Sequence, residues 1–88
     1  MKLLLFTQPN CPRCPSAKLV AEAVAKSRDD ISLEILDISD PNALTTALMM
    51  QVVSTPSFAI DEVPVFVGVV PSRQQLLARI DEYKTENR

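Results

Sequence analysis

Cys11-Pro12-Arg13-Cys14 lies between an apolar run, Lys2 to Thr7, and an alanine-rich segment that begins near Ser16. The two cysteines are the only ones in the 88-residue chain. A short continuous apolar run followed by turn-forming residues is typical of a buried strand. After the motif, apolar residues recur at helical spacing, at Ala17, Val20, Ala21, Val24 and Ala25. The stretch therefore predicts a strand, a turn that carries both cysteines, and a helix.

The residues that follow predict a parallel crossover. The first helix is expected to end at Arg28-Asp29-Asp30, and the alternation from Ile31 to Ile38 predicts a second strand parallel to the first. Asp40-Pro41 then predicts a second helix that ends near Met50, because the carboxylate can accept from a free amide and proline needs no donor at the first position. The apolar stripe expected on this second helix is Leu44, Ala47, Leu48 and Gln51-Val52.

The next segment predicts a hairpin. Ser57 to Ile60 and Val63 to Val67 are expected to pair as antiparallel strands around the tight connection Asp61-Glu62. Pro64 lacks the amide that a central strand would donate. The last strand is therefore expected at an edge of the sheet.

A third helix is expected at the end of the chain. Ser72-Arg73-Gln74-Gln75 has capping-box spacing, which predicts a helix that runs to about Tyr83, followed by a polar, fraying tail from Lys84 to Arg88. The predicted order is strand, helix, strand, helix, strand, strand, helix. This order indicates an α/β fold with a four-stranded mixed sheet and three helices, in a single domain over residues 1–88.

Composition argues against nucleic-acid and membrane partners. The net charge is −2 and the nine lysine and arginine residues are dispersed, so no phosphate-binding surface is expected. No apolar stretch approaches the roughly 20 residues of a membrane helix. The opening apolar run stops at Thr7-Gln8-Pro9, too early for a signal peptide, which predicts a cytoplasmic chain. In a reducing compartment, two cysteines three residues apart indicate a catalytic or metal-binding pair.

The position of the cysteines favours redox chemistry. A disulfide exchange catalyst needs one accessible thiol that ionises near neutral pH and a second thiol close enough to displace the captured partner. We expect Cys11 at the amino end of the helix to be the nucleophile, with Pro12 in the first helical position and Arg13 adding a cationic field. Cys14 is expected to be more shielded and to act as the resolving thiol.

On spacing alone, redox chemistry and half of a zinc site stay open. The chain has no histidine, and zinc needs about four ligands, so a metal site within one chain is disfavoured and none is predicted.

Together with three further features, the motif resembles the thioredoxin/glutaredoxin superfamily. Asn10 to Pro15 stands between the first strand and the first helix, as the dithiol of that family does. Thr55-Pro56 resembles the family's cis-proline, which packs against the dithiol and offers backbone to substrate, and Val67-Gly68-Val69 resembles its third substrate-facing loop. The element order matches from Lys2 to Tyr83. The resemblance implies a thioredoxin-like fold and substrate-binding roles for Pro12, Arg13, Thr55, Pro56 and Gly68.

Within the superfamily, the short length and the CPxCP pattern look most like the small archaeal-type thioredoxins of glutaredoxin size. Three features depart from the larger families. Asn10 stands in place of the tryptophan before the thioredoxin motif, and the run from Leu3 to Phe6 has no counterpart of thioredoxin's buried acid. The paired glycines and acidic residue with which glutaredoxins hold glutathione are missing after Thr55-Pro56.

The function implied by the resemblance is reduction of protein disulfides, with no cofactor beyond the redox-active Cys11–Cys14 disulfide. The expected partners are protein disulfide substrates and an upstream reductase, with a monomer as the working form. A small metal carrier is an alternative, because copper chaperones also place CxxC between a first strand and a first helix, although the helix expected at Asp40-Pro41 fits it less well. A domain that keeps the fold as an adaptor without turnover is another.

Overall fold

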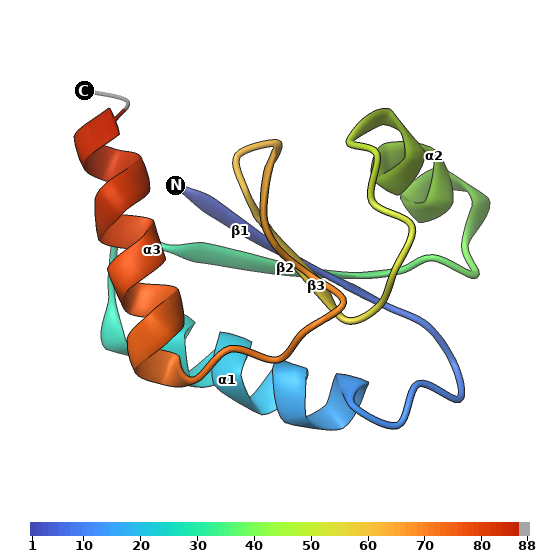
Figure 1. Ribbon diagram of the computed structural model, residues 1–88, viewed down its shortest axis with the longest axis horizontal. Coiled ribbons are helices and arrows are strands. Elements are labelled where there is room, and N and C mark those ends of the chain that lie inside the picture. Colours follow the sequence, from blue (N-terminus) through green and yellow to red (C-terminus); the bar gives the residue numbers. More distant parts are fainter. Residues whose placement is uncertain (87–88) are drawn as a thin grey trace.

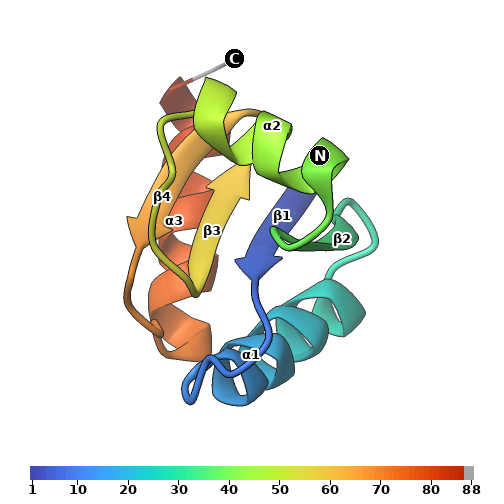
Figure 2. The same cartoon turned by 90° about the vertical axis from the view of Figure 1, so that its right-hand side faces the viewer.

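The sheet is built around two central strands that are buried on both faces. The computed structural model describes residues 1–86, and its strands are β1 (Lys2–Thr7), β2 (Ser32–Asp37), β3 (Ser57–Ile60) and β4 (Val63–Val67). They lie in the order β2-β1-β3-β4 (Figure 2). β1 pairs parallel to β2 and antiparallel to β3, and β4 pairs antiparallel to β3 at the edge. The predicted element order, the mixed sheet and the edge position of β4 are confirmed.

The helices cover the two faces of the sheet unequally. They are α1 (Cys14–Ser27), α2 (Pro41–Met49) and α3 (Arg73–Glu86). Figure 1 shows α1 and α3 on one side of the sheet and α2 on the other. Among the residues that the structure describes, no helix is long and apolar enough to cross a membrane.

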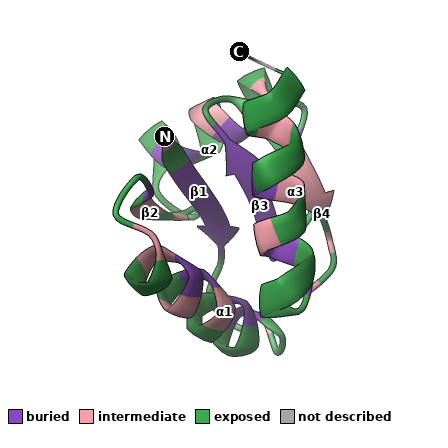
Figure 3. Cartoon of the chain, turned by 90° about the vertical axis from the view of Figure 1, so that its left-hand side faces the viewer, coloured by how far each residue is buried: buried purple, intermediate pink, exposed green. Residues whose placement is uncertain are grey.

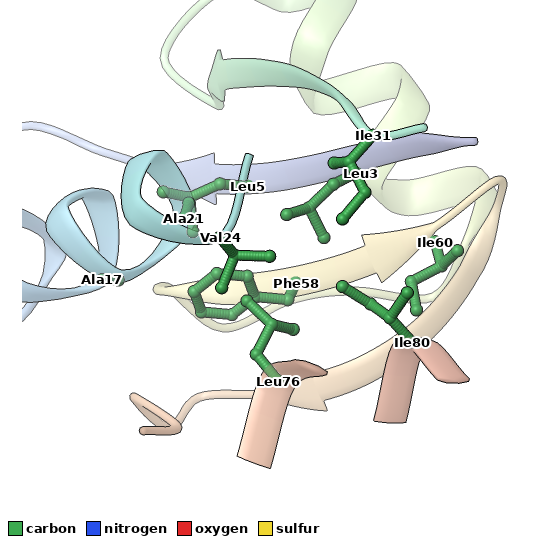
Figure 4. Packing of buried hydrophobic residues seen from close by; sticks show 10 residues of the cluster. All are labelled: Leu3, Leu5, Ala17, Ala21, Val24, Ile31, Phe58, Ile60, Leu76 and Ile80. Carbon is green, nitrogen blue, oxygen red and sulfur yellow. The ribbon is translucent and has the colours of Figure 1, made fainter. Parts of the chain in front are cut away.

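The period of a strand explains how β1 serves both faces. Successive side chains point to opposite sides of a sheet, so Leu3 and Leu5 lie under α1 and α3, whereas Leu4 and Phe6 lie under α2. Buried residues gather on β1, on β3 and on the inner faces of the helices (Figure 3). The larger cluster is seen from close by in Figure 4 and comprises Leu3, Leu5, Ala17, Ala21, Val24, Ile31, Phe58, Ile60, Leu76 and Ile80.

Local signals fix the starts of α2 and α3 as predicted. Asp40 Oδ1 accepts from the Asn42 amide at 2.9 Å, ahead of Pro41. The predicted capping box is present, since the Ser72 amide donates to Gln75 Oε1 at 2.8 Å and the Gln75 amide donates to Ser72 Oγ at 3.1 Å.

The apolar stripe predicted for α2 is partly wrong. Ala47 and Val52 are buried as expected, but Ala43 takes the third inward position. Leu44 and Leu48 are 40% and 55% exposed. The short α2 lies against the sheet through its alanines, which allow a close approach, and the two leucines are left on its outer side.

The predicted fraying tail is also wrong for Lys84, Thr85 and Glu86, which continue α3; residues 87 and 88 lie outside the described residues. Ion pairs between distant parts of the chain explain why α3 continues beyond Tyr83. Lys84 Nζ lies 2.6 Å from Asp30 Oδ2, and Arg28 contacts both Asp30 and Asp81 at 3.0 Å. These contacts join the last turns of α3 to the connection between α1 and β2.

The packing predicts that alanine substitutions at two leucines lower the free energy of unfolding by very different amounts. Leu76 is fully buried, so Leu76→Ala is expected to lower the free energy of unfolding by about 2–5 kcal/mol through lost burial and a cavity. The matched control Leu48→Ala removes a half-exposed side chain and is expected to stay within about 0.5 kcal/mol of wild type. Urea unfolding measures both, and equal losses would contradict the packing described here.

The ion pairs predict an acid-sensitive contribution to stability. Hydrogen bonds from Arg28 and then Lys84 hold the pKa of Asp30 far below its ordinary value of 3.8. The folded state therefore resists protonation of Asp30, and its contribution is present above pH 3.8 and is lost as the pH falls below that value.

Asp30→Asn is therefore expected to destabilise the protein at neutral pH, by a margin that shrinks below pH 3.8 and at high salt. Asp29→Asn is the matched control, because Asp29 has no ion pair within the described residues. Urea unfolding across pH measures the margin, and a margin that does not change with pH would contradict the assignment.

Candidate active site

The two cysteines lie in a turn that follows the end of β1. Asn10 has a φ of 65°, a conformation that asparagine tolerates better than most residues. Cys11 and Cys14 are joined by a disulfide with a Cα–Cα distance of 5.4 Å, and the Cys14 amide donates to the Cys11 carbonyl at 3.4 Å. Cys14 is only 6% exposed, whereas Cys11 is of intermediate exposure. The two sulfurs therefore differ in access from solvent, in the sense that was predicted.

The helix begins later than the sequence predicted. α1 starts at Cys14 with Arg13 as its cap, so Pro12 lies in the turn before the helix and not at its first position. The reason is Pro15, which has no amide hydrogen to donate to the Cys11 carbonyl four residues earlier. The regular bonding starts two residues further on, where the Ala17 amide donates to the Arg13 carbonyl at 3.1 Å. Cys11 thus precedes the helix by three residues.

A second segment, just before β3, lies at the same end of the sheet as the cysteine motif. The Thr55-Pro56 peptide bond is cis, as the resemblance implied, and Pro56 is fully buried. Thr55 Oγ1 is buried without a hydrogen-bond partner among the described residues. Phe6 pairs with Ser57, and Ser57 pairs with Val67. The end of β1, the start of β3 and the end of β4 therefore lie at the same end of the sheet (Figure 2).

A third segment, just after β4, contains Gly68, and hydrogen bonds of Gly68 join it to the cysteine motif and to the start of β3. Its amide donates to the Pro56 carbonyl at 3.0 Å and to Ser57 Oγ at 3.2 Å, and its carbonyl accepts from Arg13 Nη2 at 3.2 Å. Gly68 has a φ of 75°, and a Cβ there would lie 3.3 Å from Ser54 Cβ. A side chain at this position would be strained and crowded. The structure thus brings Arg13, Pro56 and Gly68 together, as the sequence analysis expected.

Ser57 is a residue of this arrangement that the sequence analysis did not single out. Its side chain is fully buried, and its hydroxyl donates to the Ser54 carbonyl while it accepts from the Gly68 amide. A hydroxyl in an otherwise apolar strand, Ser57-Phe58-Ala59-Ile60, is the signal that could have drawn attention to it. Buried polar groups are nearly always hydrogen-bonded, so such a residue points to a backbone contact that needs it.

On the other side of the sulfurs lies a pocket of about 550 Å³, which the sequence analysis also missed. Neither Pro56 nor Gly68 lines it. Its charged lining residues are Lys18 of α1 and Asp37 at the end of β2. The amide and hydroxyl of Ser39 hold the pKa of Asp37 below its ordinary value. The full lining is Thr7, Gln8, Pro9, Asn10, Cys11, Cys14, Pro15, Lys18, Leu19 and Asp37.

A larger cavity, of about 610 Å³, lies away from the dithiol. It is lined by residues of β1, β2, the start of α2 and the β3–β4 turn, among them Lys2, Glu34, Asp40 and Asp61. No residue of the cysteine motif contributes to it, so it belongs to a different part of the surface.

Comparison with known proteins assigns the chain to one family. A family model described as thioredoxin domain matches residues 1–81. A probable thioredoxin of Methanothermobacter thermautotrophicus is 38% identical over 81 residues, which cover 89% of each chain. The thioredoxin of Methanocaldococcus jannaschii is 32% identical over 80 residues, which cover 91% of this chain and 92% of the relative.

A solved structure supports the fold. Thioredoxin 1 from the thermophilic eubacterium Thermosipho africanus matches with a TM-score of 0.74 at 22% identity, and the match covers 100% of both chains. The fold is therefore thioredoxin-like, as the sequence analysis expected.

The difference in access predicts the order in which the reduced cysteines react. Brief treatment of the reduced protein with iodoacetamide is expected to modify Cys11 first, because Cys14 is buried. Peptide mass spectrometry identifies the adduct. In urea, where the burial is lost, both cysteines are expected to react together. Modification of Cys14 ahead of Cys11 in the folded protein would contradict the geometry.

Proposed function

The chain belongs to the thioredoxin family of thiol-disulfide oxidoreductases, and we propose that it reduces disulfide bonds of protein substrates through Cys11 and Cys14. The observation that carries the proposal is the disulfide between the chain's only two cysteines, with one sulfur more accessible than the other. Such a pair has the parts that disulfide exchange needs, namely an attacking thiol and a nearby resolving thiol.

The proposed reaction proceeds in two exchanges. The Cys11 thiolate attacks one sulfur of the substrate disulfide, so a mixed disulfide forms and one substrate thiolate leaves. The Cys14 thiolate then attacks the Cys11 sulfur, which releases the second substrate thiolate and leaves the Cys11–Cys14 disulfide described here. Two electrons pass from the protein to the substrate. An upstream reductase must return two electrons and two protons before the next cycle.

The neighbouring segments support a docking role for the predicted residues. Arg13, the Thr55-Pro56 peptide and Gly68 come from three parts of the chain and are held together beside the dithiol. We propose that a substrate segment lies across this end of the sheet, against Pro12 and Arg13 on one side and the backbone of Thr55 and Gly68 on the other. An extended peptide can pair with backbone groups that the fold leaves free. Within the described residues Thr55 forms no backbone hydrogen bond, whereas the amide and carbonyl of Gly68 are already engaged and would offer contact surface only.

We also propose the oligomeric state and the compartment in which the protein works. A monomer in a reducing cytoplasm fits a small dithiol protein whose two cysteines both serve exchange. Under those conditions the reduced form is regenerated by a partner enzyme, and the protein passes electrons on.

Trapping of the mixed disulfide tests this function. Cys14→Ser is expected to hold substrate proteins covalently through Cys11, because the resolving step is lost, whereas Cys11→Ser is expected to trap none. Reduction of insulin, followed by turbidity, is expected for the wild type and is expected to be lost in both variants.

Two results would contradict the proposal. Insulin reduction that survives both single substitutions would show that the dithiol is not responsible. A wild type that does not reduce insulin, together with a Cys14→Ser variant that traps no partner, would favour the adaptor function. Tight binding of Cu(I) or Zn(II) by such a protein would favour the metal carrier.

A further inference from the structure

The dithiol is approached from two sides, and these sides differ in charge. On the side of β3 and β4, residues 52–57 and 65–71 contain no charged residue, and the charge there is the guanidinium of Arg13, which the motif itself brings to Gly68. On the side of β2, the pocket that both sulfur-bearing residues line contains one cation, Lys18, and one anion, Asp37. This asymmetry follows from the strand order β2-β1-β3-β4, since the motif at the end of β1 lies between β2 and β3.

Lys18 is placed in the pocket by the geometry of α1. It lies four residues after Cys14, and residues at this spacing are neighbours on one helix face. Its side chain is exposed, and within the described part of the chain it forms no ion pair. Its charge is therefore not neutralised by a partner in the fold and remains available to act on the pocket.

Asp37 is placed there by the sheet. It is the last residue of β2 and pairs with Thr7, the last residue of β1 before the motif. One carboxylate oxygen accepts from the Ser39 amide at 2.9 Å. Like Lys18, Asp37 forms no ion pair within residues 1–86. The two side chains share a pocket without being paired to each other.

Arg13 is the other charge of the motif, and its position differs. Its guanidinium is exposed and donates to the Gly68 carbonyl on the far side of the sulfurs. From the sequence, Arg13 was expected to supply the cationic field at Cys11. The structure adds Lys18, which lines the same pocket as both cysteines.

We propose that Lys18 and Asp37 are positioning residues that set the thiolate fraction of Cys11 through opposing charges in this pocket. The inference rests on the proposed function, because it concerns the same dithiol. The ammonium of Lys18 favours the thiolate, and the carboxylate of Asp37 opposes it. Because the reduced state gains whatever stabilises its thiolate, the same two charges move the reduction potential in opposite directions.

The experiment compares single and double substitutions in the full chain. Lys18→Gln is expected to raise the pKa of the Cys11 thiol, and Asp37→Asn is expected to lower it, each by roughly half a pH unit. The pKa is read from the pH dependence of iodoacetamide alkylation of reduced Cys11. The double variant is expected to return close to wild type, and the shifts are expected to shrink in concentrated salt.

The reduction potential gives a second, independent measure. A half-unit shift in pKa is a roughly threefold change in the thiolate-to-thiol ratio, which corresponds to about 15 mV for a two-electron couple at a pH where Cys11 is mostly ionised. Equilibration with glutathione buffers is expected to show Lys18→Gln as the more reducing variant and Asp37→Asn as the more oxidising one. Structural damage would not produce shifts of opposite sign.

The matched controls are Lys26→Gln and Asp29→Asn, which remove an exposed cation of the same helix and an exposed anion outside the pocket. Both are expected to leave the pKa of Cys11 unchanged. Unchanged pKa values in Lys18→Gln and Asp37→Asn, or shifts of the same sign, would overturn the inference.

The same measurements separate this inference from the proposed function. Opposite shifts in a protein that fails to reduce insulin would support the charge assignment and contradict the function. Normal insulin reduction with no shift in the pKa of Cys11 would support the function and contradict the charge assignment.

Discussion

The burial of β1 on both faces is the constraint on which the rest of the structure depends. A strand with apolar side chains on both sides must be covered from both sides, by α1 and α3 over Leu3 and Leu5 and by α2 over Leu4 and Phe6. It must also have a strand on each edge, which β2 and β3 supply. The chain that leaves β1 therefore emerges from the middle of one end of the sheet, between β2 and β3. The cysteine motif occupies that position, with a different neighbour on each side.

Local sequence signals were sufficient to predict the element order. The apolar run of β1, the caps at Asp40 and Ser72 and the turn at Asp61-Glu62 are all set by residues close together in the chain. Asp61 and Glu62 both have positive φ values, 52° and 99°, as a tight two-residue hairpin turn requires. The start of α1 is also set locally, because Pro15 has no amide hydrogen to donate to the Cys11 carbonyl, and Pro12 is therefore not the first helical residue.

The remaining differences depend on contacts between distant residues. The exposure of Leu44 and Leu48 depends on how closely α2 lies on the sheet, which helical periodicity alone does not state. The extension of α3 depends on Asp30, 54 residues before Lys84. At the site, the family resemblance anticipated the segments at Thr55-Pro56 and Gly68. The resemblance offered nothing on the opposite side, where the register of β1 and β2 brings Asp37 into the pocket that both cysteines line.

The strand order also bears on how the protein is made. A ribosome synthesises the chain from the amino end, so β1, both cysteines, α1 and β2 emerge before Thr55, Pro56 and Gly68. At that stage the pocket with Lys18 and Asp37 has all of its residues, because its lining ends at Asp37. The opposite wall does not yet exist. A nascent chain thus carries its two thiols without the β3 and β4 segments that later enclose them, and the site is completed only when the carboxyl-terminal half joins the sheet.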